Sequence, residues 1–298
     1  MATMFSAPRA CLAPLVGAIS LATAIPLMAQ STEAPAHADV VYATVDGKDL
    51  LLDLYMPEGV ERPPLVVWIH GGAWRNGTKA QVPMLFVENG FATASLDFRQ
   101  STEARFPAAV HDIKAGIRFL RESASRFGYS VDRVAIAGSS SGAHYAALVG
   151  VTGGHHALEG GLGDHLDQSS RVDAIVSYFG ASNLTTILEQ STPFGLGVRE
   201  PALELLLGGL PDADHELGEL ASPVFHVDRA DPPLLLLHGD QDPQMPINQS
   251  HELEGAYEGL GLDVTFHVVH GAAHGGSAFY AGPARDEALA FLRRTLSR

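Results

Sequence analysis

The stretch Arg133-Val134-Ala135-Ile136-Ala137-Gly138-Ser139-Ser140-Ser141-Gly142 decides the fold of this chain. Its first half is an apolar run of strand length, and its second half matches the pattern G-x-S-x-G. Glycines two positions before and two positions after Ser140 permit a sharp turn from a strand into a helix, with the serine hydroxyl presented at the turn. The helix N-terminus that follows favours negative charge near that hydroxyl. Ser140 is therefore the candidate nucleophile, and the alternative is a glycine-rich turn without a chemical role.

Apolar runs of strand length recur on both sides of this stretch. Runs that are apolar along their whole length suit the interior of a parallel sheet covered by helices on both faces. Between them, an apolar stripe from Pro107 to Phe127 has the spacing of an amphipathic helix. The alternation predicts the α/β class, with a mainly parallel eight-stranded sheet flanked by helices. The other expected runs start at Leu65, Phe91, Ala174, Leu234 and Val264, an opening hairpin joins 41–45 to 50–55, and further helices are expected over 141–149, 251–259 and 277–296.

Two segments interrupt this alternation. Residues 152–170 are rich in glycine and histidine and are expected to form a surface loop. Residues 183–229 contain a short helical pattern from Pro201, and we expect a small partial cap there over the ligand-binding edge of the sheet. Asn183, Phe194 and Leu196 are the cap residues that could contact a ligand.

A serine nucleophile needs a general base and an acid that orients the base, and these follow the serine in chain order in this kind of fold. The run from Leu234 leads into Asp240-Gln241-Asp242-Pro243. Asp240 continues directly from the strand, whereas Asp242 lies further into the loop. Asp242 is the candidate acid, and Asp240 is the rival.

The sequence contains fourteen histidines that could serve as the base. The run from Val264 ends in His270-Gly271-Ala272-Ala273-His274, just before the last expected helix. A loop of small residues at that point can bring His274 over Ser140. His274 is therefore the candidate base, and His270, at the strand end, is the alternative with a structural role.

Acyl chemistry also needs backbone N–H groups directed at a developing oxyanion. The segment His70-Gly71-Gly72-Ala73-Trp74 follows the run from Leu65, and its glycines allow the backbone to turn in this way. The expected donors are the N–H groups of Gly72 or Ala73 and of Ser141. Trp74 is expected to wall a substrate pocket or, equally, to pack inside the fold.

Seven motifs of the chain carry a resemblance to a known family: HGGAW from His70, DFR from Asp97, FPAAVHDIKAGIRFL from Phe106, GSSSGAH from Gly138, ASP from Ala221, HGDQDPQMP from His238 and VVHGAAHGG from Val268. Together they resemble the α/β-hydrolase esterases, in particular the branch of bifunctional feruloyl and acetyl-xylan esterases. The resemblance spans residues 40–296 and implies an α/β-hydrolase fold with the triad Ser140, Asp242 and His274, which needs no cofactor. Relatives commonly carry other residues around the elbow than Ser139, Ser141 and Ala143, and this difference bears on the acyl pocket.

Composition excludes several other classes. The formal net charge of -15 repels nucleic acid and anionic membranes. Cys11 is the only cysteine, which excludes a disulfide, a thiolate metal site and a catalytic cysteine from the folded domain. Three histidines and two aspartates in the glycine-rich loop have irregular spacing, so a solvated surface is favoured there over a metal site. They are His155, His156, Asp164, His165 and Asp167.

The N-terminal segment indicates export. Leu12 to Ala29 is apolar, is broken by two prolines and leads into an alanine-rich stretch. We interpret residues 1–38 as a signal peptide and linker and 39–298 as one hydrolase domain, secreted or periplasmic. A membrane anchor is the alternative, although the two prolines disfavour a stable span.

The favoured function is a serine carboxylic-ester hydrolase that acts through an acyl-enzyme on short-chain or aryl esters. The candidate substrates include acetyl or feruloyl esters of polysaccharide, and polyesters. An amide hydrolase of the arylformamidase type would use the same triad. A non-catalytic binding protein on this fold is the third possibility, and it would be expected to have lost a triad member.

Overall fold

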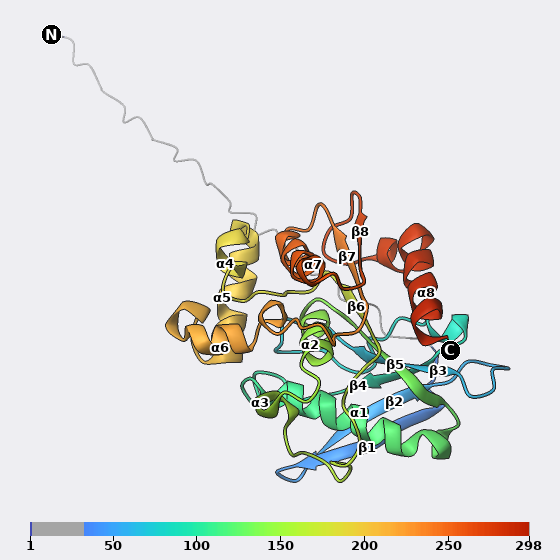
Figure 1. The fold of residues 1–298 in the computed structure, drawn as a ribbon. Coiled ribbons are helices and arrows are strands. Elements are labelled where there is room, and N and C mark those ends of the chain that lie inside the picture. Colours follow the sequence, from blue (N-terminus) through green and yellow to red (C-terminus); the bar gives the residue numbers. More distant parts are fainter. Residues whose placement is uncertain (2–32, 298) are drawn as a thin grey trace.

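Eight strands form one sheet in the computed structural model, which describes Met1 and residues 33–297. The strand order is β1-β2-β4-β3-β5-β6-β7-β8. β2 pairs antiparallel with β1 and with β4, and all of the other neighbouring strands in this order pair parallel. The expected mainly parallel, eight-stranded α/β sheet is therefore confirmed (Figure 1). The strands are β1 (His37–Val45), β2 (Lys48–Tyr55), β3 (Pro64–Ile69), β4 (Ala92–Leu96), β5 (Ser130–Ser139), β6 (Ala174–Tyr178), β7 (Leu234–Gly239) and β8 (Val264–Val269).

Helices cover both faces of this sheet (Figure 1). Leu65 and Val67 of β3 join one apolar cluster with α1, α2 and α7, whereas Val66 and Trp68 join a second cluster with α8. Successive strand residues point to opposite faces, so a strand with two buried faces must be apolar throughout. The longer helices are α1 (Ala108–Phe127), α2 (Ser141–Val151), α5 (Pro193–Leu207), α7 (Asn248–Leu260) and α8 (Gly282–Leu296). The shorter ones are α3 (His156–Glu159), α4 (Ile187–Gln190) and α6 (His215–Leu220), with 3-10 turns at η1 (Val87–Asn89), η2 (Pro211–Ala213), η3 (Pro223–Phe225) and η4 (Ser277–Phe279).

The segment expected to form a cap is more helical than its sequence pattern predicts. It holds α4, α5 and α6, which lie together at one side of the sheet in Figure 1. Helix α5 begins at Pro193, eight residues before the predicted start at Pro201. The Thr192 hydroxyl accepts from the Gly195 N–H, and proline suits the first helical turn, so the start is well capped. The two glycines at 195 and 197 weaken the helical pattern in the sequence.

Other features of the chain also differ from the predictions. β1 begins at His37, so the last two residues assigned to the linker form part of the sheet. Shifts in its register with β2 interrupt the alternation that marks a strand. The last helix begins at Gly282, with Pro283 in its first turn, and not at Ser277. The loop over 152–170 contains the short helix α3.

Residues 2–32 lie outside the described residues. They include Cys11 and the apolar segment interpreted as a signal peptide. Within residues 33–297, every helix is too short or too polar to cross a bilayer.

Candidate active site

Ser140 lies on a tight turn between β5 and α2. Its φ of 54° and ψ of -124° are strained for a residue with a side chain. A Cβ on Gly138 would lie 2.4 Å from the Gly142 carbonyl oxygen, and one on Gly142 would lie 2.2 Å from the Ile69 carbonyl oxygen. The two motif glycines therefore let the turn close on itself and on the end of β3. Ser140 stays partly exposed at this edge.

The segment from His70 to Trp74 packs directly against this turn. A Cβ on Gly71 would lie 3.2 Å from the Ser140 Cβ. Ala73 and Trp74 have φ values of 53° and 62°, so two residues with side chains adopt the left-handed conformation. The contact of Gly71 therefore fixes the start of this turn beside Ser140, and Gly72 and Ala73 follow it directly in the chain. Ser141 is the first residue of α2, where an N–H has no acceptor within its own helix.

His274 connects Ser140 to Asp242 by two hydrogen bonds. His274 Nε2 lies 2.8 Å from Ser140 Oγ, and His274 Nδ1 lies 2.6 Å from Asp242 Oδ2. A carboxylate only accepts, so Nδ1 carries the proton and Nε2 is left to accept from the Ser140 hydroxyl. The structure thus brings together the three residues predicted from chain order, each on a loop at the carboxyl end of a strand.

The Asp242 side chain is fully buried and is surrounded by donors. Its Oδ1 accepts from the N–H groups of Gln244 and Met245 at 2.8 and 2.9 Å. Its Oδ2 lies 3.4 Å from His238 Nε2 in addition to its bond from His274. Burial raises the pKa of Asp242, but the two histidines outweigh it and hold the pKa well below its ordinary value. Asp242 is therefore a carboxylate at neutral pH.

His274 is poised as a neutral imidazole. Burial lowers its pKa, and the Asp242 carboxylate offsets only part of this effect. The Phe179 ring stands edge-on to the imidazole, with the ring centroids 4.9 Å apart. A neutral imidazole with Nε2 directed at a hydroxyl can act as a general base.

The rival residues Asp240 and His270 form a separate pair at the surface. His270 Nδ1 lies 2.8 Å from Asp240 Oδ2, and the His270 side chain is 83% exposed. Asp240 also accepts from the Gly271 N–H. This pair has the same residue types as Asp242 and His274 but does not contact Ser140.

Trp74 is 1% exposed, so its side chain packs inside the fold, which is one of the two roles expected for it. Its Nε1–H donates to His144 Nδ1 at 3.0 Å, and His144 Nε2–H donates to the Ala221 carbonyl at 2.7 Å. His144 is fully buried, and burial lowers its pKa to about 4. The turn beside Ser140 is thus tied, through two buried rings, to the segment that follows α6.

The three candidate cap residues differ in position. Asn183 is buried, and its side-chain amide donates to Glu252 on α7. Asn183 therefore joins the cap segment to helix α7. Phe194, on the first turn of α5, is 41% exposed. Leu196 is half-buried on the same helix.

Sequence reasoning did not identify Arg199, on α5. This residue is 1% exposed, and its guanidinium carbon lies 5.7 Å from the centre of the Trp74 ring. Its positive charge lowers the pKa of His274. An arginine within a helical pattern is typical of an exposed face, so the sequence carries no signal of this placement.

The histidines and aspartates of the 152–170 loop do not converge. His155 packs against His226, and His165 packs against Phe119. Among residues 33–297, no three histidine, cysteine or acidic side chains are grouped as metal ligands would be.

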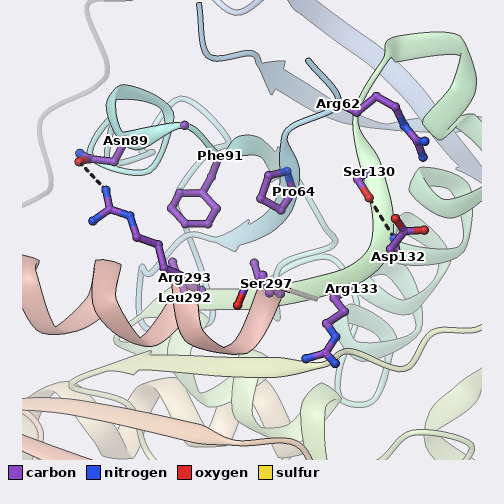
Figure 2. Close-up of a pocket in the computed structure, with 12 residues that line it drawn as sticks. Arg62, Pro64, Asn89, Phe91, Ser130, Asp132, Arg133, Leu292, Arg293 and Ser297 are labelled. Carbon is purple, nitrogen blue, oxygen red and sulfur yellow. Dashed lines mark hydrogen bonds between the residues drawn. The ribbon is translucent and has the colours of Figure 1, made fainter. Parts of the chain in front are cut away.

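A cavity of about 580 Å³ lies at the other end of the sheet (Figure 2). Pro64 and Ser130, which line it, begin the strands β3 and β5. The C-terminal end of α8 forms another wall. Ligands of α/β sheets bind beyond the carboxyl ends of the strands, where Ser140 lies, so this cavity is separate from the candidate active site.

The BD-FAE family model matches residues 52–257 of the chain, which include Ser140 and Asp242. Esterase LipQ of Mycobacterium tuberculosis is 30% identical over 235 residues, which are 75% of this chain and 53% of LipQ. The chain spans about half the length of the curated relatives that it matches first.

Two solved structures resemble the chain along most of its length. A truncated form of a carbohydrate esterase from gut microbiota has a TM-score of 0.81 and 29% identity, and the likeness covers 89% of this chain and 100% of that one. Thermogutta terrifontis esterase 2 phosphonylated by sarin has a TM-score of 0.72 and 25% identity, with 89% and 98% covered. The family match runs from β2 to α7 and contains most of the sheet. The chain belongs to the BD-FAE family of α/β-hydrolase esterases.

Proposed function

We propose that this protein is a serine carboxylic-ester hydrolase that works by two-step acyl transfer. The observation that carries the proposal is the hydrogen-bonded series Asp242–His274–Ser140 at the carboxyl edge of the sheet. The relatives support it, because LipQ is named an esterase and the structural neighbours are a carbohydrate esterase and an esterase.

In the first step, His274 Nε2 takes the proton of the Ser140 hydroxyl while Oγ attacks the ester carbonyl. The carbonyl oxygen becomes an oxyanion, which the N–H groups of Ala73 or Gly72 and of Ser141 stabilise. Each such donor is worth about 3 kcal/mol in the transition state. The imidazolium, stabilised by Asp242, then gives its proton to the leaving alcohol, and an acyl group remains on Ser140.

In the second step, water replaces the alcohol. His274 takes one proton from the water while the water oxygen attacks the acyl carbon. The second oxyanion then collapses and releases the carboxylic acid. The proton on His274 returns to Ser140 Oγ. These residues supply all of the proton transfers that ester hydrolysis requires.

A fluorophosphonate probe tests this assignment, because it reacts only with an activated serine. Mass spectrometry of the labelled protein is expected to locate the adduct on Ser140. The Ser140→Ala variant is expected to be unlabelled and to lose at least about 10³-fold in kcat. Labelling of another serine, or near wild-type turnover by Ser140→Ala, would overturn the proposal.

For the substrate, we propose esters of short acyl chains, including acetyl or feruloyl groups on polysaccharide. The cap segment is short, and a shallow pocket desolvates few methylenes at about 0.8 kcal/mol each. Measurement of kcat/KM on 4-nitrophenyl esters from acetate to palmitate is expected to peak between about two and six carbons. A maximum at about twelve carbons or more would indicate a deep acyl tunnel. An N-formyl arylamine in the same panel distinguishes the alternative amide hydrolase.

Export is a further part of the proposal, resting on the apolar N-terminal segment alone. N-terminal sequencing of protein exported by a bacterial host is expected to begin between about Gln30 and Val40. An intact Met1 on cytoplasmic protein would contradict it.

A further inference from the structure

Arg199 carries a buried charge that no carboxylate among residues 33–297 contacts. Its residue exposure is 1%, and its Nε and Nη2 have no hydrogen-bond partner among residues 33–297. No carboxylate of those residues lies within 4.0 Å of the guanidinium. Buried charges are normally paired, because the loss of hydration is otherwise uncompensated. An unpaired buried arginine therefore calls for a partner of another kind.

The fold holds Arg199 beside the candidate catalytic groups. At the start of α5, the Thr192 hydroxyl donates to the Pro243 carbonyl, next to Asp242. A Cβ on Gly195 would lie 3.0 Å from the Gln244 carbonyl oxygen, so this face of α5 packs on the turn that contains Asp242. Arg199 follows Gly195 by four residues and thus lies on the same face of the helix. Its guanidinium stands over the Trp74 ring, beside the turn of Ala73.

The charge of Arg199 reaches the catalytic groups. Burial lowers the pKa of Arg199 and the Asp242 carboxylate partly offsets this effect, so that the pKa is about 10. The guanidinium therefore remains charged at neutral pH. Asp242 does not serve as its counter-ion by contact, because neither of its oxygens lies within 4.0 Å of the guanidinium; they accept from His274, Gln244 and Met245 instead. The net charge of the chain is -15, so a local positive site is needed if an anionic substrate is to be held here.

We propose that Arg199 is a specificity-determining residue that binds a carboxylate of the substrate, separate from the ester that is cleaved. A guanidinium matches a carboxylate through two parallel N–H···O bonds, and the low dielectric around Arg199 strengthens that pair. The substrate class is then an ester with a free carboxylate close to the scissile bond, in the acid part or the alcohol part. This inference rests on the proposed ester hydrolysis at Ser140.

The experiment compares esters that differ only in the carboxylate. In the acid part, the mono-4-nitrophenyl ester of glutaric acid is compared with 4-nitrophenyl pentanoate. In the alcohol part, acetoxyacetic acid is compared with ethyl acetate, in which a methyl group replaces the carboxylate. Wild type and Arg199→Met are assayed on all four, because methionine retains an apolar stem of similar length.

The variant is expected to lose about 30-fold or more in kcat/KM on the carboxylate ester of one pair and less than about threefold on its neutral partner. The pair that shows the loss identifies the side of the ester that carries the carboxylate. If kcat/KM falls equally on the two esters of each pair, the proposal is overturned and Arg199 has a structural role. If kcat/KM does not fall on any of the four esters, the proposal is overturned as well. Failure of the esterase proposal is distinguishable, because Ser140→Ala would then retain turnover on the neutral esters.

Calorimetry on Ser140→Ala, with Arg199 intact, covers the case in which Arg199→Met does not fold. Here the products are the probes: glutarate against pentanoate for the acid part, and glycolate against ethanol for the alcohol part. At least about tenfold tighter binding of one carboxylate-bearing product supports the proposal. Equal binding within both pairs refutes it.

Discussion

Replacement of Asp242 by asparagine should disable the site while leaving its shape intact. The carboxylate accepts two backbone N–H groups on Oδ1 and faces His274 and His238 on Oδ2. In Asp242→Asn, the amide oxygen takes the Oδ1 position, because only an acceptor can face two N–H groups. The amide NH₂ then faces His274 Nδ1, which must lose its proton and become the acceptor.

His274 in that tautomer carries its proton on Nε2 and cannot accept one from Ser140. The variant also lacks the negative charge that stabilises the imidazolium. The same substitution in a serine triad lowers kcat by about 10⁴-fold, which equals about 5.4 kcal/mol at about 1.36 kcal/mol per decade. We expect a loss of that order in kcat on 4-nitrophenyl acetate, with KM changed by less than about threefold.

Asp240→Asn is the matched control, since it changes the same residue type two positions away in the same turn. Its partner His270 is 83% exposed, so activity should remain within about twofold of wild type. Thermal melting of both variants verifies that they fold. The reasoning is refuted if the two variants lose equal activity, or if Asp240→Asn loses more.

Three further predictions concern pH, the Trp74 ring and the elbow glycine. Because burial lowers the pKa of His274 and the neutral imidazole is the base, kcat/KM should fall only as pH drops through a midpoint below 6.5; a midpoint above 7 in a pH–rate profile contradicts this. Trp74→Phe leaves His144 Nδ1 buried without a donor, so urea unfolding should show a loss of about 1–3 kcal/mol, and kcat should fall more than KM changes; unchanged stability would exclude this role. Gly142→Ala should abolish activity, since its Cβ has no room, whereas Gly255→Ala on α7, with nothing within 4 Å, should gain about 0.4–1 kcal/mol; an active Gly142→Ala enzyme would disprove the packing argument.

The architecture follows from sequence patterns that act locally. A strand covered on both faces must be apolar at every position, and β3, β5, β6 and β7 were recognisable for that reason. The elbow was equally clear, because only small residues at 138 and 142 allow the backbone to approach itself and β3 so closely. Caps and bulges shift strand and helix ends by a few residues, which is why β1, α5 and α8 begin elsewhere than predicted.

The tertiary structure alone decided which side chains meet. Two aspartates share one turn and two histidines share one loop, and each aspartate bonds one histidine, at 2.8 Å for Asp240 and 2.6 Å for Asp242. Asp242 and His274 are buried and His274 contacts Ser140, whereas Asp240 and His270 lie at the surface and do not contact Ser140. Both the burial and the contact depend on strands that are far apart in the chain. Arg199 is the clearer case, because its buried guanidinium stands over the ring of Trp74, 125 positions away in the sequence (199 minus 74). Local patterns specify backbone conformation, whereas the environment of a charge is set by packing between distant segments.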